Sequence, residues 1–263
     1  MSNLSEYTEF AIQTAREAGN LLIKNYGEMH KLEWKLRTNF KIEVDDLSDR
    51  LIRKRINDKF PSHGINSEEG KDKIGRYDFV WVVDPLDGTI PYTYGVNDHF
   101  GVCIALVSQG SPIVGVTFAP LRRELYVAEQ GKGAFCNGSP IKVTDETDIN
   151  KVLMVMDGGK ETEEFRRASI APNIAKLYAP NGVTNLFSYG CASVSLAQVA
   201  AGKMHAYSAM SLEPWDMASG VIINREAGAE VTNLKGSQWK LGDKSILSAN
   251  PKLHSKLLDL LNN

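Results

Sequence analysis

The sequence predicts a fold that combines an α+β half with an α/β half, and three patterns support this prediction. Residues 5–26 and 46–60 repeat apolar side chains at helical spacing, and Pro61 ends the second helix. Short strand-like runs separated by turn residues follow, as is typical of an antiparallel meander. Beyond residue 140, strand-like and helix-like runs alternate, which is typical of an α/β arrangement.

The antiparallel part begins with the run 79–83, which is rich in β-branched and aromatic residues and stops at Asp84-Pro85. Turns are expected at Gln109-Gly110, at residues 121–123 and at Asn137-Gly138. The strands between these turns are expected at residues 99–107, 112–119 and 124–129.

In the second half, the expected strands are 152–156, 183–187, 205–209 and 245–249, and the expected helices are 161–178, 191–201, 215–227 and 251–261. A soft boundary within 144–151 divides the chain into an N-terminal half, 1–145, and a C-terminal half, 146–263. No stretch rich in Gly, Ser and Pro marks this boundary, so the halves are expected to pack as one rigid body.

The bulk composition is that of an ordinary globular enzyme, with 263 residues, 43% hydrophobic and 24% charged. A net charge of −2 supplies no bulk attraction for nucleic acid or anionic lipid. We expect no membrane partner and a cytoplasmic location, because no apolar run approaches the roughly 18 residues of a membrane span and residues 1–10 lack a signal-peptide pattern. Three widely spaced cysteines fit neither a disulfide framework nor a zinc site.

The segment from Trp81 to Thr89 carries the most chemical information. Asp84 and Asp87 leave the end of a buried strand, and their oxygens are the ligands that Mg²⁺ prefers. If a helical turn begins after Asp87, the amides of Gly88 and Thr89 form an anion site, and metals beside such amides suit phosphoryl transfer. Because Asp-Pro and Asp-Gly are common turn dipeptides, a plain turn is an equally good interpretation of this segment alone.

Two further acidic residues have similar alternatives. Glu68, in the stretch 67–70, is either a metal ligand or part of an exposed acidic loop. Asp216, in the stretch 213–220, is either a metal ligand or a cap at the start of a helix. Neither segment decides the matter by itself.

Taken together, these segments resemble the inositol monophosphatase family, within the lithium-sensitive, magnesium-dependent phosphatase superfamily. The matching pieces occur in the family's order and spacing and span nearly the whole chain: residues 60–63, 68–69, 81–89, 131–138 and 215–228. The resemblance implies a layered α-β-α-β-α sandwich and a homodimer.

The resemblance also implies two to three Mg²⁺ ions in each active site. Asp84 would bridge two of them. Glu68 and the Leu86 carbonyl would complete one metal site, and Asp87 and Asp216 would complete the second. Glu68 would also contact a third, more weakly held ion.

For catalysis, the resemblance implies that Asp45 takes the proton of the Thr89 hydroxyl, which orients a metal-activated water for in-line attack on phosphorus. Asp45 and Asp46 also sit at a helix start, where a capping residue is expected in any case. The implied substrate-binding residues are Asp87, Gly88, Thr89, Gly190, Cys191, Ala192 and Asp216.

The sequence departs from the family at the end of the substrate away from the phosphate. Ile90-Pro91-Tyr92 replaces a common Thr-Asn-Phe, Ala209 replaces a ring-binding glutamate, and Phe187 replaces an arginine. Cys191 stands where relatives carry a hydroxyl residue. A site that hydrogen-bonds a substrate hydroxyl discriminates strongly between substrates. Because Ala209 cannot accept such a bond as the glutamate does, the case for inositol phosphate as the substrate is weaker.

The predicted function is hydrolysis of a small phosphorylated metabolite, with inositol 1-phosphate as the first candidate. Histidinol phosphate, fructose 1,6-bisphosphate and a nucleotide 3′-phosphate are alternative substrates. A non-catalytic metal-binding scaffold is a different class of protein, and the Asp45–Thr89 pair argues against it because a scaffold has no need of that pair.

Cys191 is expected at the N-terminus of a helix, where the helix dipole favours a reactive thiolate. A buried, inert thiol is an equally weighted alternative. Cys103 lies in an apolar strand and is expected to be inert, and Cys136 is expected to react without consequence.

Overall fold

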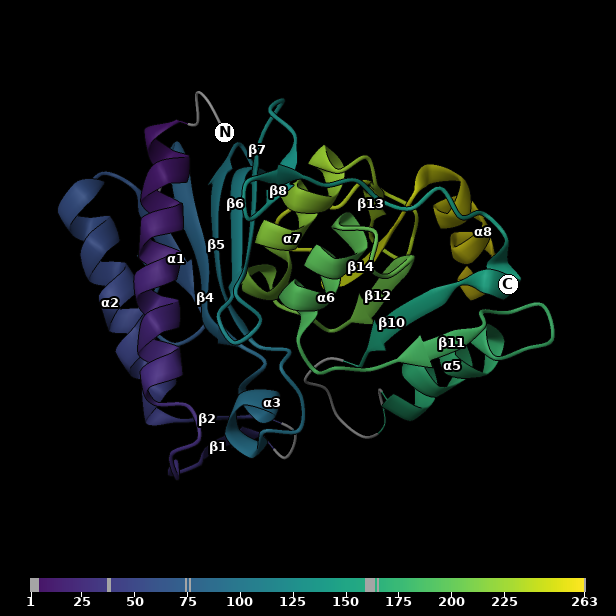
Figure 1. Ribbon diagram of the computed structural model, residues 1–263, viewed down its shortest axis with the longest axis horizontal. Helices are drawn as coiled ribbons and strands as arrows, with labels where there is room; N and C mark the ends of the chain where they lie inside the picture. The colour runs from purple at the N-terminus through teal and green to yellow at the C-terminus, as the bar shows by residue number, and fades with distance from the viewer. Residues whose placement is uncertain are drawn as a thin grey trace.

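The computed structural model describes residues 5–36, 39–73, 75, 77–158, 164 and 166–262. Its helices and sheets form five layers (Figure 1). An outer helical layer packs on a seven-stranded sheet, two central helices separate that sheet from a five-stranded one, and further helices cover the far side (Figure 1). This arrangement confirms the predicted α-β-α-β-α sandwich.

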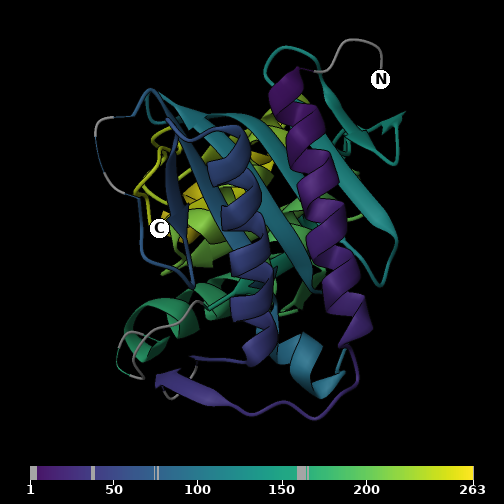
Figure 2. The same ribbon diagram turned by 90° about the vertical axis from the view of Figure 1, so that its left-hand side faces the viewer.

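The first helical layer consists of α1 (Glu6–Lys24) and α2 (Glu43–Lys59), which lie side by side across the seven-stranded sheet (Figure 2). Ser5 caps α1 by accepting a hydrogen bond from the backbone N–H of Thr8. The apolar stripe of α1, including Phe10 and Leu22, is buried against the sheet because its side chains recur at the helical period.

The seven-stranded sheet has the order β3-β4-β5-β6-β7-β8-β9. All its neighbouring strands are antiparallel except β3 and β4, so the predicted meander is confirmed. Its strands are β3 (Gly64–Ser67), β4 (Phe79–Asp87), β5 (Gly101–Ser108), β6 (Ser111–Ala119), β7 (Glu124–Glu129), β8 (Ala134–Cys136) and β9 (Ser139–Pro140).

The central layer consists of α6 (Ala192–Ala200) and α7 (Pro214–Glu226), which are apolar on nearly all sides because they face both sheets. Small residues let these elements approach closely. A Cβ atom at Gly115 of β6 would lie 2.3 Å from Cγ2 of Ile222, and one at Gly220 would lie 2.6 Å from Cδ1 of Leu196. The helices therefore pack tightly against each other and against the first sheet.

The five-stranded sheet has the order β11-β10-β12-β14-β13. Strands β10, β11 and β12 are parallel, whereas β14 is antiparallel to both β12 and β13. Its strands are β10 (Leu153–Asp157), β11 (Asn185–Phe187), β12 (Ala206–Met210), β13 (Glu230–Thr232) and β14 (Ser245–Ala249). The outer helices are α5 (Ala171–Leu177) and α8 (Pro251–Asn262), and the short helix η1 spans Ile149–Lys151.

Several elements differ from the sequence prediction. Strand β4 continues through Asp87 instead of ending at Asp84, and α2 begins at Glu43 instead of Asp46. The hairpin of β1 (Glu33–Leu36) and β2 (Asn39–Lys41), strand β3 and helix α3 (Thr89–Tyr94) were not expected. Part of the helix expected at 161–178 lies outside the described residues, and its described part contains the π-helical turn η2 (Arg166–Ile170) and α5.

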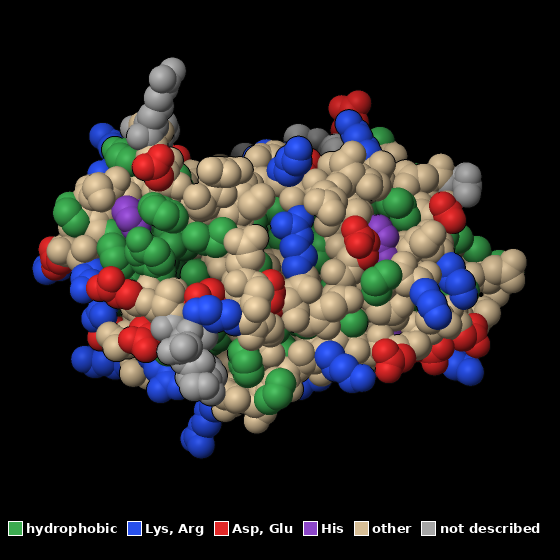
Figure 3. Space-filling view, turned by 90° about the horizontal axis from the view of Figure 1, so that it is seen from above, with side chains coloured by type: hydrophobic (Ala, Val, Ile, Leu, Met, Phe, Trp, Pro, Cys, Tyr) green, Lys and Arg blue, Asp and Glu red, His purple; other side chains and the backbone are tan. Residues whose placement is uncertain are grey.

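Lysine, arginine, aspartate and glutamate side chains are interspersed over the face shown in Figure 3. Across the described ranges, no helix combines the length and the apolar character that a bilayer span requires.

Candidate active site

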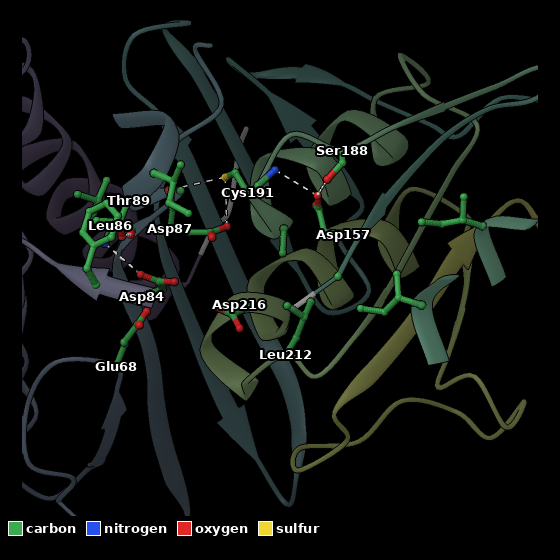
Figure 4. Close-up of a pocket in the computed structure, with 18 of the residues that line it drawn as sticks. Glu68, Asp84, Leu86, Asp87, Thr89, Asp157, Ser188, Cys191, Leu212 and Asp216 are labelled. Atoms are coloured by element: carbon green, nitrogen blue, oxygen red, sulfur yellow. Dashed lines mark hydrogen bonds between the residues drawn. The ribbon is translucent and has the colours of Figure 1, made fainter. Parts of the chain in front are cut away.

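Three carboxylates from separate parts of the chain meet where the first sheet approaches α7. Glu68 directly follows β3, Asp84 lies on β4 and Asp216 lies in the first turn of α7. One oxygen from each lies within 4.8 Å of the other two, and all three surround one cavity (Figure 4). Oxygen ligands at this spacing fit a hard divalent cation such as Mg²⁺.

The pairing of β4 with β5 sets the direction of Asp84. Asp84 pairs with Cys103 and Asp87 with Gly101, so the register shifts between the two carboxylates. The Oδ1 atom of Asp84 accepts the backbone N–H of Leu86 at 3.0 Å. An irregular segment of this kind re-aims side chains, which explains how both carboxylates face one cavity.

The Asp87 carboxylate is buried and is held by the N-terminus of α6. Its Oδ2 atom accepts the backbone N–H of Ser193 at 2.7 Å and the thiol of Cys191 at 3.2 Å. Asp87 lines the same cavity as the three clustered carboxylates but lies outside their 4.8 Å group.

Gly88 is the N-cap of α3 and Thr89 its first residue, so the condition set for an anion site, a helical turn after Asp87, is met. Gly88 has φ of +86°, and a Cβ atom there would lie 2.5 Å from the carbonyl oxygen of His99. Only glycine fits this position, because its backbone is left-handed and the space is filled. The Thr89 hydroxyl donates to the Leu86 carbonyl at 3.2 Å.

Asp45 and Asp46 lie in the first turn of α2, so the expectation that one of them is the N-cap is wrong: Ile42 holds that position. The Oδ2 atom of Asp45 nonetheless accepts the Ile42 backbone N–H at 2.7 Å and completes the helix start. Burial raises the pKa of Asp45 to about 8, against the opposing effect of this bond. Asp45 does not line the cavity, and its proton transfer with Thr89 stays a prediction.

Lys35 of the β1–β2 hairpin brings a positive charge to this acidic region. Its Nζ atom lies 2.5 Å from Oε1 of Glu69 and 3.5 Å from Oε1 of Glu68. Burial raises the pKa of Glu69, and the hydrogen bond from Lys35 opposes that shift. No local sequence pattern marks this hairpin, so the sequence analysis did not place Lys35 beside the acidic residues.

The cavity has a volume of about 500 Å³. Every residue predicted to bind metal or substrate lines it, and Asp45 is the one predicted site residue that does not: the lining residues include Glu68, Asp84, Leu86, Asp87, Gly88, Thr89, Gly190, Cys191, Ala192 and Asp216. The roles assigned to these residues remain predictions.

Other lining residues were not predicted. They include the apolar side chains of Ile170, Ile174 and Leu212. Asp157 and Ser188 add polar atoms to the lining. Asp157 directly follows the predicted strand 152–156, and polar residues at the carboxyl ends of parallel strands often mark ligand sites, so this position was an available signal.

The expectation of a reactive thiolate at Cys191 is wrong. Cys191 does precede α6 as its N-cap, but it is only 1% exposed. Burial raises the pKa of its thiol, and the negative charge of Asp87 raises it further. The buried alternative is the correct one, because these two effects outweigh the helix dipole. Burial likewise raises the pKa values of Cys103, as expected for an inert thiol, and of the half-buried Cys136.

Ala209 and Phe187 are both absent from the described lining of the cavity. Ala209 is completely buried on β12, opposite Asp157 of β10. The ring of Phe187 stacks on Tyr189, with 5.7 Å between the ring centroids. Phe187 therefore belongs to an aromatic stack, whereas Ala209 places a small apolar side chain beside the Asp157 carboxylate.

Comparisons with known proteins agree with this architecture. The chain is 31% identical to an inositol-1-monophosphatase of Bacillus subtilis, over 98% of this chain and 97% of the relative. It is 30% identical to a fructose-1,6-bisphosphatase/inositol-1-monophosphatase of Thermotoga maritima, over 97% and 95% of the two chains. The solved extragenic suppressor protein suhB of Bartonella henselae superposes with a TM-score of 0.92 at 29% identity, covering 98% of this chain and 99% of that chain.

The structure is a layered α/β sandwich with three clustered carboxylates that could hold a metal ion. The chain belongs to the inositol monophosphatase family, since the model of that family matches residues 3–263. It is accordingly a phosphoric monoester hydrolase.

Proposed function

We propose that the protein is a Mg²⁺-dependent phosphomonoesterase that acts on a small phosphorylated metabolite, with inositol 1-phosphate as the first candidate. The observation that carries the proposal is the meeting of Glu68, Asp84 and Asp216 within 4.8 Å in one cavity. Carboxylates this close repel one another unless a proton or a cation compensates their charge.

In this proposal, Asp84 would be shared by two metal sites, of which Glu68 and the Leu86 carbonyl would complete one and Asp87 and Asp216 the other. Two to three Mg²⁺ ions, when bound there, would polarise the ester and lower the pKa of the attacking water. Gly88 and Thr89 hold the phosphate through their backbone amides. The Thr89 hydroxyl, which donates to the Leu86 carbonyl in this structure, would turn toward ionised Asp45, which would take its proton, and Thr89 would then orient the attacking water.

The remaining substrate contacts are proposed for Gly190, Cys191 and Ala192, which line the cavity at the start of α6. Because Cys191 donates its thiol hydrogen to Asp87, we assign it to the support of that carboxylate and to cavity shape, not to covalent chemistry.

Fructose 1,6-bisphosphate is the second candidate substrate. The observation that favours it is the Thermotoga maritima relative, whose name combines fructose-1,6-bisphosphatase with inositol-1-monophosphatase. If one site cleaves both inositol 1-phosphate and fructose 1,6-bisphosphate, its pocket for the leaving group must accept two different carbon skeletons.

The proposal also includes a homodimer, a cytoplasmic location and inhibition by Li⁺. Light scattering tests the assembly against the 29.0 kDa mass of one chain. Phosphate release measured with rising Li⁺ at fixed Mg²⁺ tests the inhibition.

The deciding experiment is a phosphate-release screen with Mg²⁺, run with and without excess chelator. The panel contains inositol 1-phosphate, fructose 1,6-bisphosphate, histidinol phosphate and a nucleotide 3′-phosphate. Chelator-sensitive hydrolysis of at least one ester supports the proposal, and the ratio of kcat/KM values ranks the candidates. Equal turnover in chelator would overturn the metal requirement.

A further inference from the structure

We propose that Asp157 is a positioning residue for the metal-binding carboxylate of Asp87, acting through the loop 188–193. This inference rests on the proposed function, because it concerns the affinity of the site for Mg²⁺. Asp157 lies at the end of β10 in the second sheet, whereas Asp87 lies at the end of β4 in the first. The loop between them joins the two sheets at the cavity.

Asp157 holds the near end of this loop. Its Oδ1 atom accepts the Ser188 hydroxyl at 2.8 Å and the Gly190 backbone N–H at 3.1 Å (Figure 4). Asp157 is only 6% exposed, so these bonds are shielded from water. Hydrogen bonds to an ionised carboxylate are stronger than those between neutral groups, so this pair of bonds holds a short loop in place.

The far end of the same loop holds Asp87. Gly190 has φ of +72°, and this left-handed turn leads directly into Cys191 and α6. The Cys191 thiol and the Ser193 backbone N–H both bind Oδ2 of Asp87. Because Asp157 and Asp87 both bind this loop, the position in which Asp157 holds the loop sets the orientation of the Asp87 carboxylate.

The strand register explains why Asp157 reaches the loop. Asp157 pairs with Ala209 of β12, and Val155 pairs with Tyr207, so these four side chains share one face of the sheet. That face packs against the central helices, with Val155, Tyr207 and Ala209 in the core that contains α6 and α7. Ala209, which pairs with Asp157, places a small apolar side chain beside the Asp157 carboxylate.

The surroundings of Tyr207 show that these acidic groups share one electrostatic environment. Burial raises the pKa of the Tyr207 hydroxyl, and the negative charges of Asp157, Asp87 and Asp216 raise it further. Burial also raises the pKa of Asp157, while the hydrogen bonds from Gly190 and Ser188 act in the opposite direction. Asp157 is thus close to the ligand set without belonging to the three clustered carboxylates.

The test compares two substitutions at one position. Asp157→Asn keeps an oxygen that can accept both loop bonds and removes the negative charge. Asp157→Ala removes the acceptor altogether. Because residues that orient a metal ligand typically contribute a factor of about 10–100 in affinity, titration calorimetry should show at least 10-fold weaker Mg²⁺ binding for Asp157→Ala. Asp157→Asn should stay within about threefold of the wild type.

Asp243→Ala is the matched control. Asp243 also anchors a loop through two hydrogen bonds, from Asn233 and from the Lys240 backbone, but it does not line the cavity. Its loss should lower Tm and leave Mg²⁺ affinity unchanged. If Asp157→Ala does not fold, Ser188→Ala removes one loop bond and should weaken Mg²⁺ binding by about threefold or more.

Two results would overturn the inference. One is a folded Asp157→Ala, or failing that Ser188→Ala, that binds Mg²⁺ as tightly as the wild type while its Tm falls. The other is an Asp157→Asn variant as weak as Asp157→Ala, since that would assign the effect to charge and not to loop anchoring. A wild-type protein that binds no Mg²⁺ and hydrolyses no ester would instead overturn the proposed function.

Discussion

Trp81 donates its indole N–H to Nδ1 of His63 at 3.1 Å, deep in the layer between α2 and the first sheet. This bond exists only while Nδ1 carries no proton. The His63 ring also stacks on Phe60, with 4.9 Å between the ring centroids. Burial lowers the pKa of His63, and the charge of Lys73 lowers it further.

Stability should therefore decrease on acidification through His63. Its pKa in the folded protein is lower than the unfolded value of about 6.5, so protons bind the unfolded chain more tightly. The stabilisation is present above pH 6.5 and is lost as the pH falls below it. Tm measured from pH 8 to pH 5 should fall, and the slope should be smaller in His63→Asn, whose Oδ1 accepts the Trp81 bond without titrating. An equal slope in both proteins would assign the effect to other groups.

Asp216→Asn tests the metal cluster with little change in shape. The Oδ2 atom of Asp216 accepts the Glu213 backbone N–H at 2.7 Å, and an asparagine oxygen can take over that bond. Helix α7 should stay formed, while loss of a ligand charge should lower turnover by about 100-fold or more. Phosphate release and Tm are measured together. Near-wild-type turnover would make Asp216 a capping residue only.

Mg²⁺ should stabilise the folded protein, because it binds carboxylates that only folding brings together. At a Mg²⁺ concentration 100 times the dissociation constant, the gain is about 2.7 kcal/mol. Tm should therefore rise with Mg²⁺ and return on chelation, and the rise should shrink in Asp216→Asn. A Tm that does not respond to Mg²⁺ would contradict the assigned site.

Cys191 should resist alkylation in the folded protein. Its thiol is buried, and its raised pKa keeps it protonated at neutral pH. Mass spectrometry after a short treatment with iodoacetamide should find Cys136 labelled first, since Cys103 and Cys191 are both buried. Cys191→Ser should retain activity because a hydroxyl can donate to Asp87 in the same way. Rapid labelling of Cys191 would show that the start of α6 opens in solution.

Ser211 adopts a left-handed backbone with φ of +55°, just before the segment that carries Asp216. A non-glycine residue there costs about 1–2 kcal/mol, while glycine adds about 0.5–1 kcal/mol of entropy loss on folding. Ser211→Gly should therefore raise the free energy of unfolding by about 0.5 kcal/mol. The control is Ser237→Gly at an exposed position without a positive φ, which should lower it. Denaturant unfolding measures both.

Hydrophobic periodicity was sufficient to predict the helices and the meander, because those elements bury one face along a regular pattern. It failed where tertiary pairing overrides local preference. Asp84-Pro85 is a turn signal, yet β4 continues to Asp87 because pairing with β5 resumes at Asp87 and Gly101 after the irregular residues 85 and 86. The β1–β2 hairpin carries no glycine at its turn, so no local signal marked it.

The candidate site was likewise predictable from the sequence only in part. The resemblance to the inositol monophosphatase family predicted ten of the residues that line the cavity, because its motifs lie at the ends and starts of elements that meet there. The state of Cys191 was not predictable, since it depends on Asp87, which lies 104 residues away in the chain. Asp157 was missed because its loop contacts are set by strand order, which spacing alone does not reveal.

The central helices impose an order of events on a chain that is made from its N-terminus. The seven-stranded sheet is complete at Pro140, but one of its faces is covered by α7, which ends at Glu226. At synthesis rates of about 5–20 residues per second, that apolar face stays exposed for roughly 4–17 s before α7 has been synthesised. The nascent protein should therefore depend on chaperones during this interval, and a slower ribosome should lower its soluble yield.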